Sequence, residues 1–133
     1  MRRIIVLAAL LGAAYPCGSS VASTTSHRIV FGVVGGNLAA YQVTIEPTGR
    51  IRSSQVRTKY HVLSRAKVVS LSRLVRASFA SGLKSRICPG TNPDFGSKFI
   101  QAYGRTVRVR GSCEPRFHRL WDTLAQAVGL RFG

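Results

Sequence analysis

Short stretches in which apolar and polar residues alternate predict the strands of this chain, because alternation places every second side chain on one face of a sheet. Such alternation occurs in residues 28–34, 41–45 and 106–110, and residues 97–103 also have the composition of a strand. Gly35-Gly36-Asn37 separates the first two stretches and Gly104-Arg105 the last two. Two antiparallel hairpins are therefore predicted. The polar, basic residues 51–60 are expected to form an irregular or edge strand.

Two longer stretches carry apolar residues at spacings of three and four, which is typical of amphipathic helices. The first covers residues 64–81, with Ser64 as its N-cap and Gly82 where a left-handed C-cap is wanted. The second has Pro115 at its first position and ends at Gly129. The two expected apolar stripes are Val68, Leu71, Leu74, Val75 and Phe79 in the first helix, and Phe117, Leu120, Trp121, Leu124 and Val128 in the second.

The order strand-strand-helix-strand-strand-helix indicates an α+β fold in a single small domain. We expect the two hairpins to join in one antiparallel sheet, with both helices packed on one of its faces.

The N-terminus has the pattern of a secretory signal peptide. Arg2 and Arg3 precede an apolar run at residues 4–14, which is shorter than the roughly 20 residues of a membrane span. Ser20-Val21-Ala22 supplies small residues before a cleavage site after Ala22. The expected product is residues 23–133, with 23–27 as a loose tail and no transmembrane segment, in a secreted or periplasmic location. An uncleaved anchor, a cut after Ala14 and a lipid on Cys17 remain alternatives.

Cleavage changes the number of cysteines from three to two, because it removes Cys17 and leaves Cys88 and Cys113. An oxidising compartment favours a disulfide between them. This bond is expected to tie the two helices together at one end. Two free buried thiols are the alternative.

Residues suited to catalysis are few and scattered. The four acids Glu46, Asp94, Glu114 and Asp122 lie in separate elements, and the three histidines show no metal-ligand spacing. No phosphate-binding or dinucleotide-binding motif is present, so we expect neither an enzyme nor a cofactor or metal site. His118 and Asp122, four residues apart on one helix, leave open a general base, with a solvated surface contact as the other interpretation.

A strong positive charge is the other feature of the composition. Without Arg2 and Arg3, 18 of the 20 lysines and arginines remain against four acids, a net charge of about +14. Such a charge attracts polyanions. The expected basic surface comprises Arg65, Arg73 and Arg76 on the first helix and Arg108 and Arg110 on the outward face of a strand, with the intervening valines turned inward. Few aromatic residues lie among these cations, so specific nucleic-acid binding is not expected.

Several short motifs together resemble a known family. They are Gly35-Gly36 after the first strand, Leu71-Ser72-Arg73-Leu74-Val75 in the first helix, Asp94 before a strand, the hairpin Gly104-Arg105-Thr106-Val107-Arg108-Val109, and the spaced leucines of the last helix. Over residues 28–128, this layout resembles the emfourin-like proteins, small bacterial inhibitors of thermolysin-like metalloproteases. The export signal, the cysteine pair and the basic stretch 50–59 depart from that family's pattern.

The resemblance implies reversible blocking of a protease cleft by a rigid loop. The candidate loops are the turn Gly35-Gly36-Asn37 and residues 89–94, which include Pro89, Gly90 and Asp94. The leading hypothesis is therefore a secreted binding or inhibitor module with an extracellular protease as partner. The alternative is an electrostatic binder of an anionic polymer or a cell-envelope surface.

Overall fold

The computed structural model describes residues 27–131 of the chain. The expected signal peptide at residues 1–22, most of the expected tail at residues 23–27 and the last two residues lie outside this range. His27, the last residue of that tail, lies with its ring centroid 4.4 Å from the ring of Tyr103.

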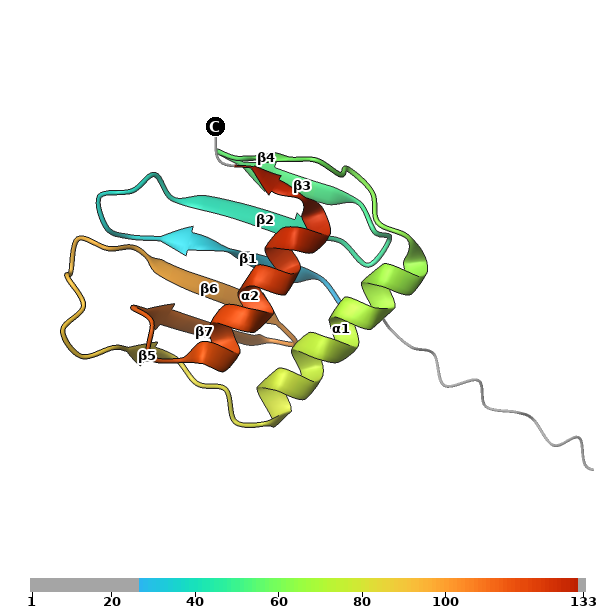
Figure 1. Ribbon diagram of the computed structural model, residues 1–133. Helices are drawn as coiled ribbons and strands as arrows, with labels where there is room; N and C mark the ends of the chain where they lie inside the picture. Colours follow the sequence, from blue (N-terminus) through green and yellow to red (C-terminus); the bar gives the residue numbers. More distant parts are fainter. Residues whose placement is uncertain (1–26, 132–133) are drawn as a thin grey trace, which may run out of the picture.

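One sheet of six strands forms the body of the domain, with the strand order β3-β2-β1-β6-β7-β5 (Figure 1). Neighbouring strands are antiparallel, except that β5 runs parallel to β7. The strands are β1 (Ile29–Val34), β2 (Tyr41–Ile45), β3 (Ile51–Ser54), β5 (Arg86–Ile87), β6 (Ser97–Ala102) and β7 (Arg105–Arg110). A separate pair joins β4 (Arg57–Thr58) to β8 (Leu130–Arg131).

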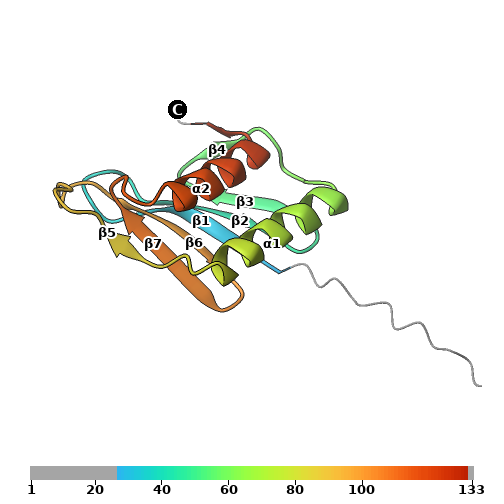
Figure 2. The same cartoon turned by 60° about the horizontal axis from the view of Figure 1, so that its bottom comes forward.

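Both helices, α1 (Arg65–Ala80) and α2 (Pro115–Val128), cover the same face of the sheet (Figure 2). The α+β class and the single small domain are therefore confirmed, and the predicted order of hairpins and helices agrees with the structure. The sheet is mixed rather than wholly antiparallel, because the unpredicted strand β5 pairs with β7 in parallel. The two-residue strands β5 and β8 are additions.

The helix ends follow from local chemistry. Ser64 accepts a hydrogen bond from the backbone N–H of Lys67 at 3.2 Å, as expected of an N-cap. Gly82 and Gly129 both have the positive φ of a left-handed cap. No helix within residues 27–131 has both the length and the apolar character needed to cross a membrane.

The core lies between the helices and the sheet. Every residue of the apolar stripe predicted for α2 is buried, and in α1 four of the five are buried. The exception is Leu74, which is 41% exposed. The prediction for Leu74 was wrong because the stripe of α1 that faces the sheet is narrower than its apolar spacing suggests.

The second hairpin turns one residue earlier than predicted. Tyr103 and Gly104 have φ values of 53° and 68°, while Arg105 already belongs to β7. Positive φ at both central residues is the conformation that fits the twist of a two-residue hairpin. Tyr103, rather than Arg105, therefore shares the turn with Gly104.

The disulfide between Cys88 and Cys113 is confirmed. It does not join the two helices directly, because β5 lies between α1 and Cys88. Instead it links the chain leaving β5 to the chain entering α2.

Candidate functional site

Two loops that are far apart in sequence meet at one end of the sheet. Residues 35–40 connect β1 to β2, and residues 89–96 lead into β6. β1 and β6 are neighbours, and Val34 lies opposite Ser97, so the two loops lie side by side at the same end of these strands (Figure 1). We refer to residues 35–40 and 89–96 together as the loop end.

The two loops are joined by a direct contact. The backbone N–H of Asn37 donates a hydrogen bond to the carbonyl oxygen of Asp94 at 2.9 Å. Gly36, with a φ of 72°, packs so closely that a Cβ atom there would overlap backbone atoms of Asp94 and Gly96. The approach of the loops therefore requires glycine at position 36, for its conformation and for its lack of a side chain.

The longer loop is also fixed by its own hydrogen bonds. The Oδ1 atom of Asn92 accepts from the backbone N–H of Asp94 at 2.9 Å, and its carbonyl oxygen accepts from that of Phe95 at 3.1 Å. The hydroxyl of Thr91 donates to the carbonyl oxygen of Cys88 at 2.8 Å. A loop held in this way loses little conformational entropy when it binds a partner.

The disulfide anchors the base of this loop to the sheet. The N–H of Cys88 donates to the carbonyl oxygen of Arg110 at 2.9 Å, and the N–H of Cys113 lies 3.0 Å from the sulfur of Cys88. Gly111, with a φ of 89°, leaves room for the Cys88 side chain. Residues 88 and 110–113 therefore form a small rigid base next to the loop end.

Large apolar side chains are exposed around the loop end. Leu38 is 65% exposed and Phe95 is 60% exposed, one on each loop, and Ile87 at the end of β5 is 71% exposed. Exposed apolar side chains on loops that are held in place are candidate contacts for a partner. The sequence does not reveal these three residues, because neither an apolar residue in a loop nor one in a two-residue strand has a periodicity that separates burial from exposure.

The charge at the loop end differs from that of the rest of the domain. Three of the four acidic side chains form ion pairs, Glu46 with Arg52, Asp122 with Lys98 and Glu114 with Arg116. Asp94 has no cationic partner within residues 27–131, and it is exposed.

The strand that follows the first loop begins at a buried tyrosine. Tyr41 lies opposite Val33 in the sheet, and burial raises the pKa of Tyr41 to about 12. The first loop is thus fixed at both ends by paired strands.

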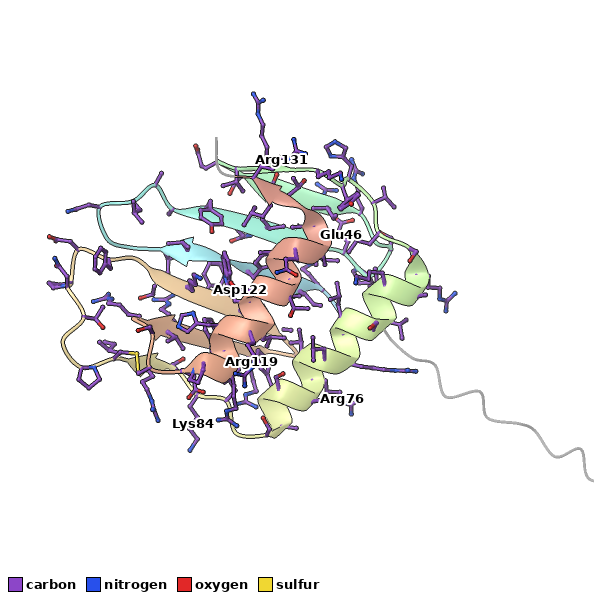
Figure 3. The ribbon with its side chains drawn as sticks, in the orientation of Figure 1. Glu46, Arg76, Lys84, Arg119, Asp122 and Arg131 are labelled. Atoms are coloured by element: carbon purple, nitrogen blue, oxygen red, sulfur yellow. A yellow bond between two sulfur atoms is a disulfide. The ribbon has the colours of Figure 1, made fainter. Side chains whose placement is uncertain are left out.

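The predicted site residues fall into two groups. Gly35, Gly36 and Asn37 meet the loop that contains Pro89, Gly90 and Asp94. The predicted basic residues do not form one surface, because Arg65, Arg73 and Arg76 belong to α1 whereas Arg108 and Arg110 belong to β7 on the far side of the core. Figure 3 shows Arg76 on α1, the helix that covers the near face of the sheet.

The structure gives His118 and Asp122 separate partners. The Nε2 atom of His118 lies 2.8 Å from the carbonyl oxygen of Gly111, and Asp122 pairs with Lys98 at 3.8 Å. Trp121 is buried, and its Nε1–H donates to the carbonyl oxygen of Gly32 at 3.3 Å. Residues 27–131 contain no group of three or more His, Cys, Asp or Glu side chains placed to hold a metal ion.

In comparisons with protein-family models, curated proteins and solved structures, the chain matches none of them.

Proposed function

We propose that this protein is an exported binding module whose loop end inserts into the cleft of an extracellular thermolysin-like metalloprotease and blocks it reversibly. The observation that carries the proposal is the hydrogen bond between Asn37 and Asp94, which holds two loops together while Leu38 and Phe95 stay exposed beside it.

Rigidity and exposed apolar area favour a protein as the partner. Apolar anchors near the centre of an interface supply most of the binding free energy, and preorganised loops reduce the entropic cost of binding. Both features occur at the loop end, where the backbone is hydrogen bonded and the disulfide fixes the base.

The choice of a protease as partner rests on the resemblance to emfourin-like inhibitors described above. The N-terminal pattern adds the compartment, since an exported chain meets extracellular proteases. The mass of the exported product tests the predicted export without testing inhibition, and we expect cleavage after Ala22.

Inhibition is tested with residues 23–133, oxidised at Cys88–Cys113, added to thermolysin and a short fluorogenic peptide substrate. We expect hydrolysis to slow at micromolar or lower inhibitor concentrations and to recover on dilution. Full activity of a panel of thermolysin-like enzymes at inhibitor concentrations well above the micromolar range would remove the proposal.

Paired variants localise the interface. Leu38→Asp and Phe95→Asp are expected to weaken inhibition at least about tenfold each, roughly 1.4 kcal/mol, because they place a charge at an apolar anchor. Val62→Asp is the control, since Val62 is also apolar and 67% exposed. It forms an isolated β-bridge with Arg50, which follows the end of β2 that is farther from the loop end. An equal effect of all three variants would show that the loop end is not the contact surface.

A further inference from the structure

The face of the sheet that the helices leave uncovered carries a second cluster of residues. On β7, Val107 faces the core opposite Ile100, so Thr106, Arg108 and Arg110 point to the other face. Both helices lie on the core side of the sheet (Figure 2). These residues are therefore open to a ligand that approaches from the uncovered side.

A groove of about 480 Å³ runs along this part of the face. Three arginines, three hydroxyl side chains and one exposed isoleucine line it. They are Ser85, Arg86, Ile87, Ser97, Thr106, Arg108 and Arg110, and we call this site the arginine groove.

Backbone pairing and side-chain contacts fix the walls of the arginine groove. Ile87 pairs with Arg110 through the parallel β5–β7 contact, and the hydroxyl of Ser85 accepts from the backbone N–H of Arg108 at 2.9 Å. The Nε atom of Arg110 donates to the hydroxyl of Ser97 at 3.3 Å. The cations are thus attached to a paired sheet rather than to a loop.

The positive charge of the arginine groove is not balanced locally. The ion pairs within residues 27–131 involve Arg52, Lys98 and Arg116, and none of them uses a groove arginine. No acidic residue lines the groove. Guanidinium groups suit carboxylate groups and tetrahedral anions such as phosphate and sulfate.

The rest of the uncovered face indicates which kind of polyanion fits. Gln101, Val30 and Thr44 form a cross-strand row on this face, in which Gln101 adds an exposed amide and Thr44 a half-buried hydroxyl on either side of the buried Val30. The aromatic residue of β6 on this face, Phe99, is only 6% exposed and offers no surface on which bases can stack. Uncharged polar groups beside clustered arginines fit sugar hydroxyls with anionic substituents.

We propose that the arginine groove binds an anionic polysaccharide. Its sulfate or carboxylate groups pair with Arg86, Arg108 and Arg110, while its sugar hydroxyls contact Thr106 and Gln101 beside them. This site lies on the uncovered face of the sheet and shares only Ile87 with the apolar residues named around the loop end. It therefore goes beyond protease inhibition and does not depend on it.

The proposal is tested by measuring the affinity of residues 23–133, with the disulfide formed, for heparin as the probe. The triple variant Arg86→Gln/Arg108→Gln/Arg110→Gln is expected to reduce heparin affinity at least tenfold at 0.1 M NaCl. Its salt dependence should also decrease, by about one unit of log–log slope for each arginine lost. The matched control is Arg65→Gln/Arg73→Gln/Arg76→Gln, which removes the same charge from α1 and is expected to change the affinity by less than about threefold, since these charges lie outside the groove.

Other outcomes decide against the proposal. Equal losses in the two triple variants, or no binding of heparin by the unaltered chain, would show that no localised site exists. Tighter binding of single-stranded poly(dT) or of phosphatidylserine vesicles, lost in the groove variant, would assign the site to a different ligand. Circular dichroism verifies folding, and the single variant Arg108→Gln replaces the triple variant if that fails to fold. Protease inhibition by the groove variant is measured separately, so failure of one proposal leaves the other testable.

Discussion

Gly35 and Gly36 are adjacent residues with nearly equal backbone angles, φ of 71° and 72°, but different surroundings. A Cβ atom at position 35 would meet nothing within 4 Å, whereas at position 36 it would overlap the backbone of the second loop. The pair therefore separates the cost of an unfavourable φ from the cost of pushing the loops apart.

We predict that Gly35→Ala lowers the free energy of unfolding by about 1 kcal/mol, the cost of left-handed geometry for a residue with a side chain. Gly36→Ala should cost at least about 1 kcal/mol more, because the Asn37–Asp94 contact must also open. Urea unfolding followed by Trp121 fluorescence measures both. Equal destabilisation by the two changes would mean that the loops do not need their close approach.

The residues of the candidate site differ in how far they can be predicted. The turn at residues 35–37 has a composition that marks it directly. Leu38, Phe95 and Arg86 carry no local signal, because their importance comes from exposure or from neighbours far away in sequence. Arg86 lines the groove only because β5 pairs with β7.

At the scale of elements, the disulfide and strand β5 act together. Cys88 follows β5 directly, and its bond to Cys113 closes a sequence separation of 25 residues. We predict that Cys88→Ala/Cys113→Ala lowers the free energy of unfolding by about 3.5 kcal/mol, the loop-closure entropy for 25 residues.

The disulfide prediction is measured by urea unfolding with and without reductant. Reduction of the unaltered protein should match the double variant, and reductant should leave the double variant unchanged. An unfolding midpoint of the unaltered protein that does not respond to reduction would contradict the prediction.

Elements long enough to repeat their apolar spacing were predictable from the sequence, and the two-residue strands were not. All five apolar positions expected in α2 are buried. They could be predicted because a helix of about four turns repeats its apolar spacing often enough to be recognised. β5 and β8 have two residues each and show no period. The neighbouring positions of β1 and β6, which bring the loops together, depend on the path of the whole chain.

At the scale of the molecule, excess positive charge works against the folded state. Of the 18 lysines and arginines within residues 27–131, three form ion pairs with acids in the same range, and the net charge of residues 23–133 is about +14. Folding brings these charges closer together than they are in the unfolded chain. Their mutual repulsion therefore lowers the free energy of unfolding, even though the individual cations are exposed to solvent.

Screening should relieve this repulsion, so we predict that the melting temperature of residues 23–133 rises when NaCl increases from 0.05 to 0.5 M. The screening length decreases from about 14 to about 4 Å over that range, which removes most interactions between exposed charges. Differential scanning calorimetry measures the change. The control is Arg65→Gln/Arg73→Gln/Arg76→Gln, which lowers the charge by three and should show a smaller rise. A melting temperature that falls with salt would mean that the three ion pairs outweigh the repulsion among the remaining cations.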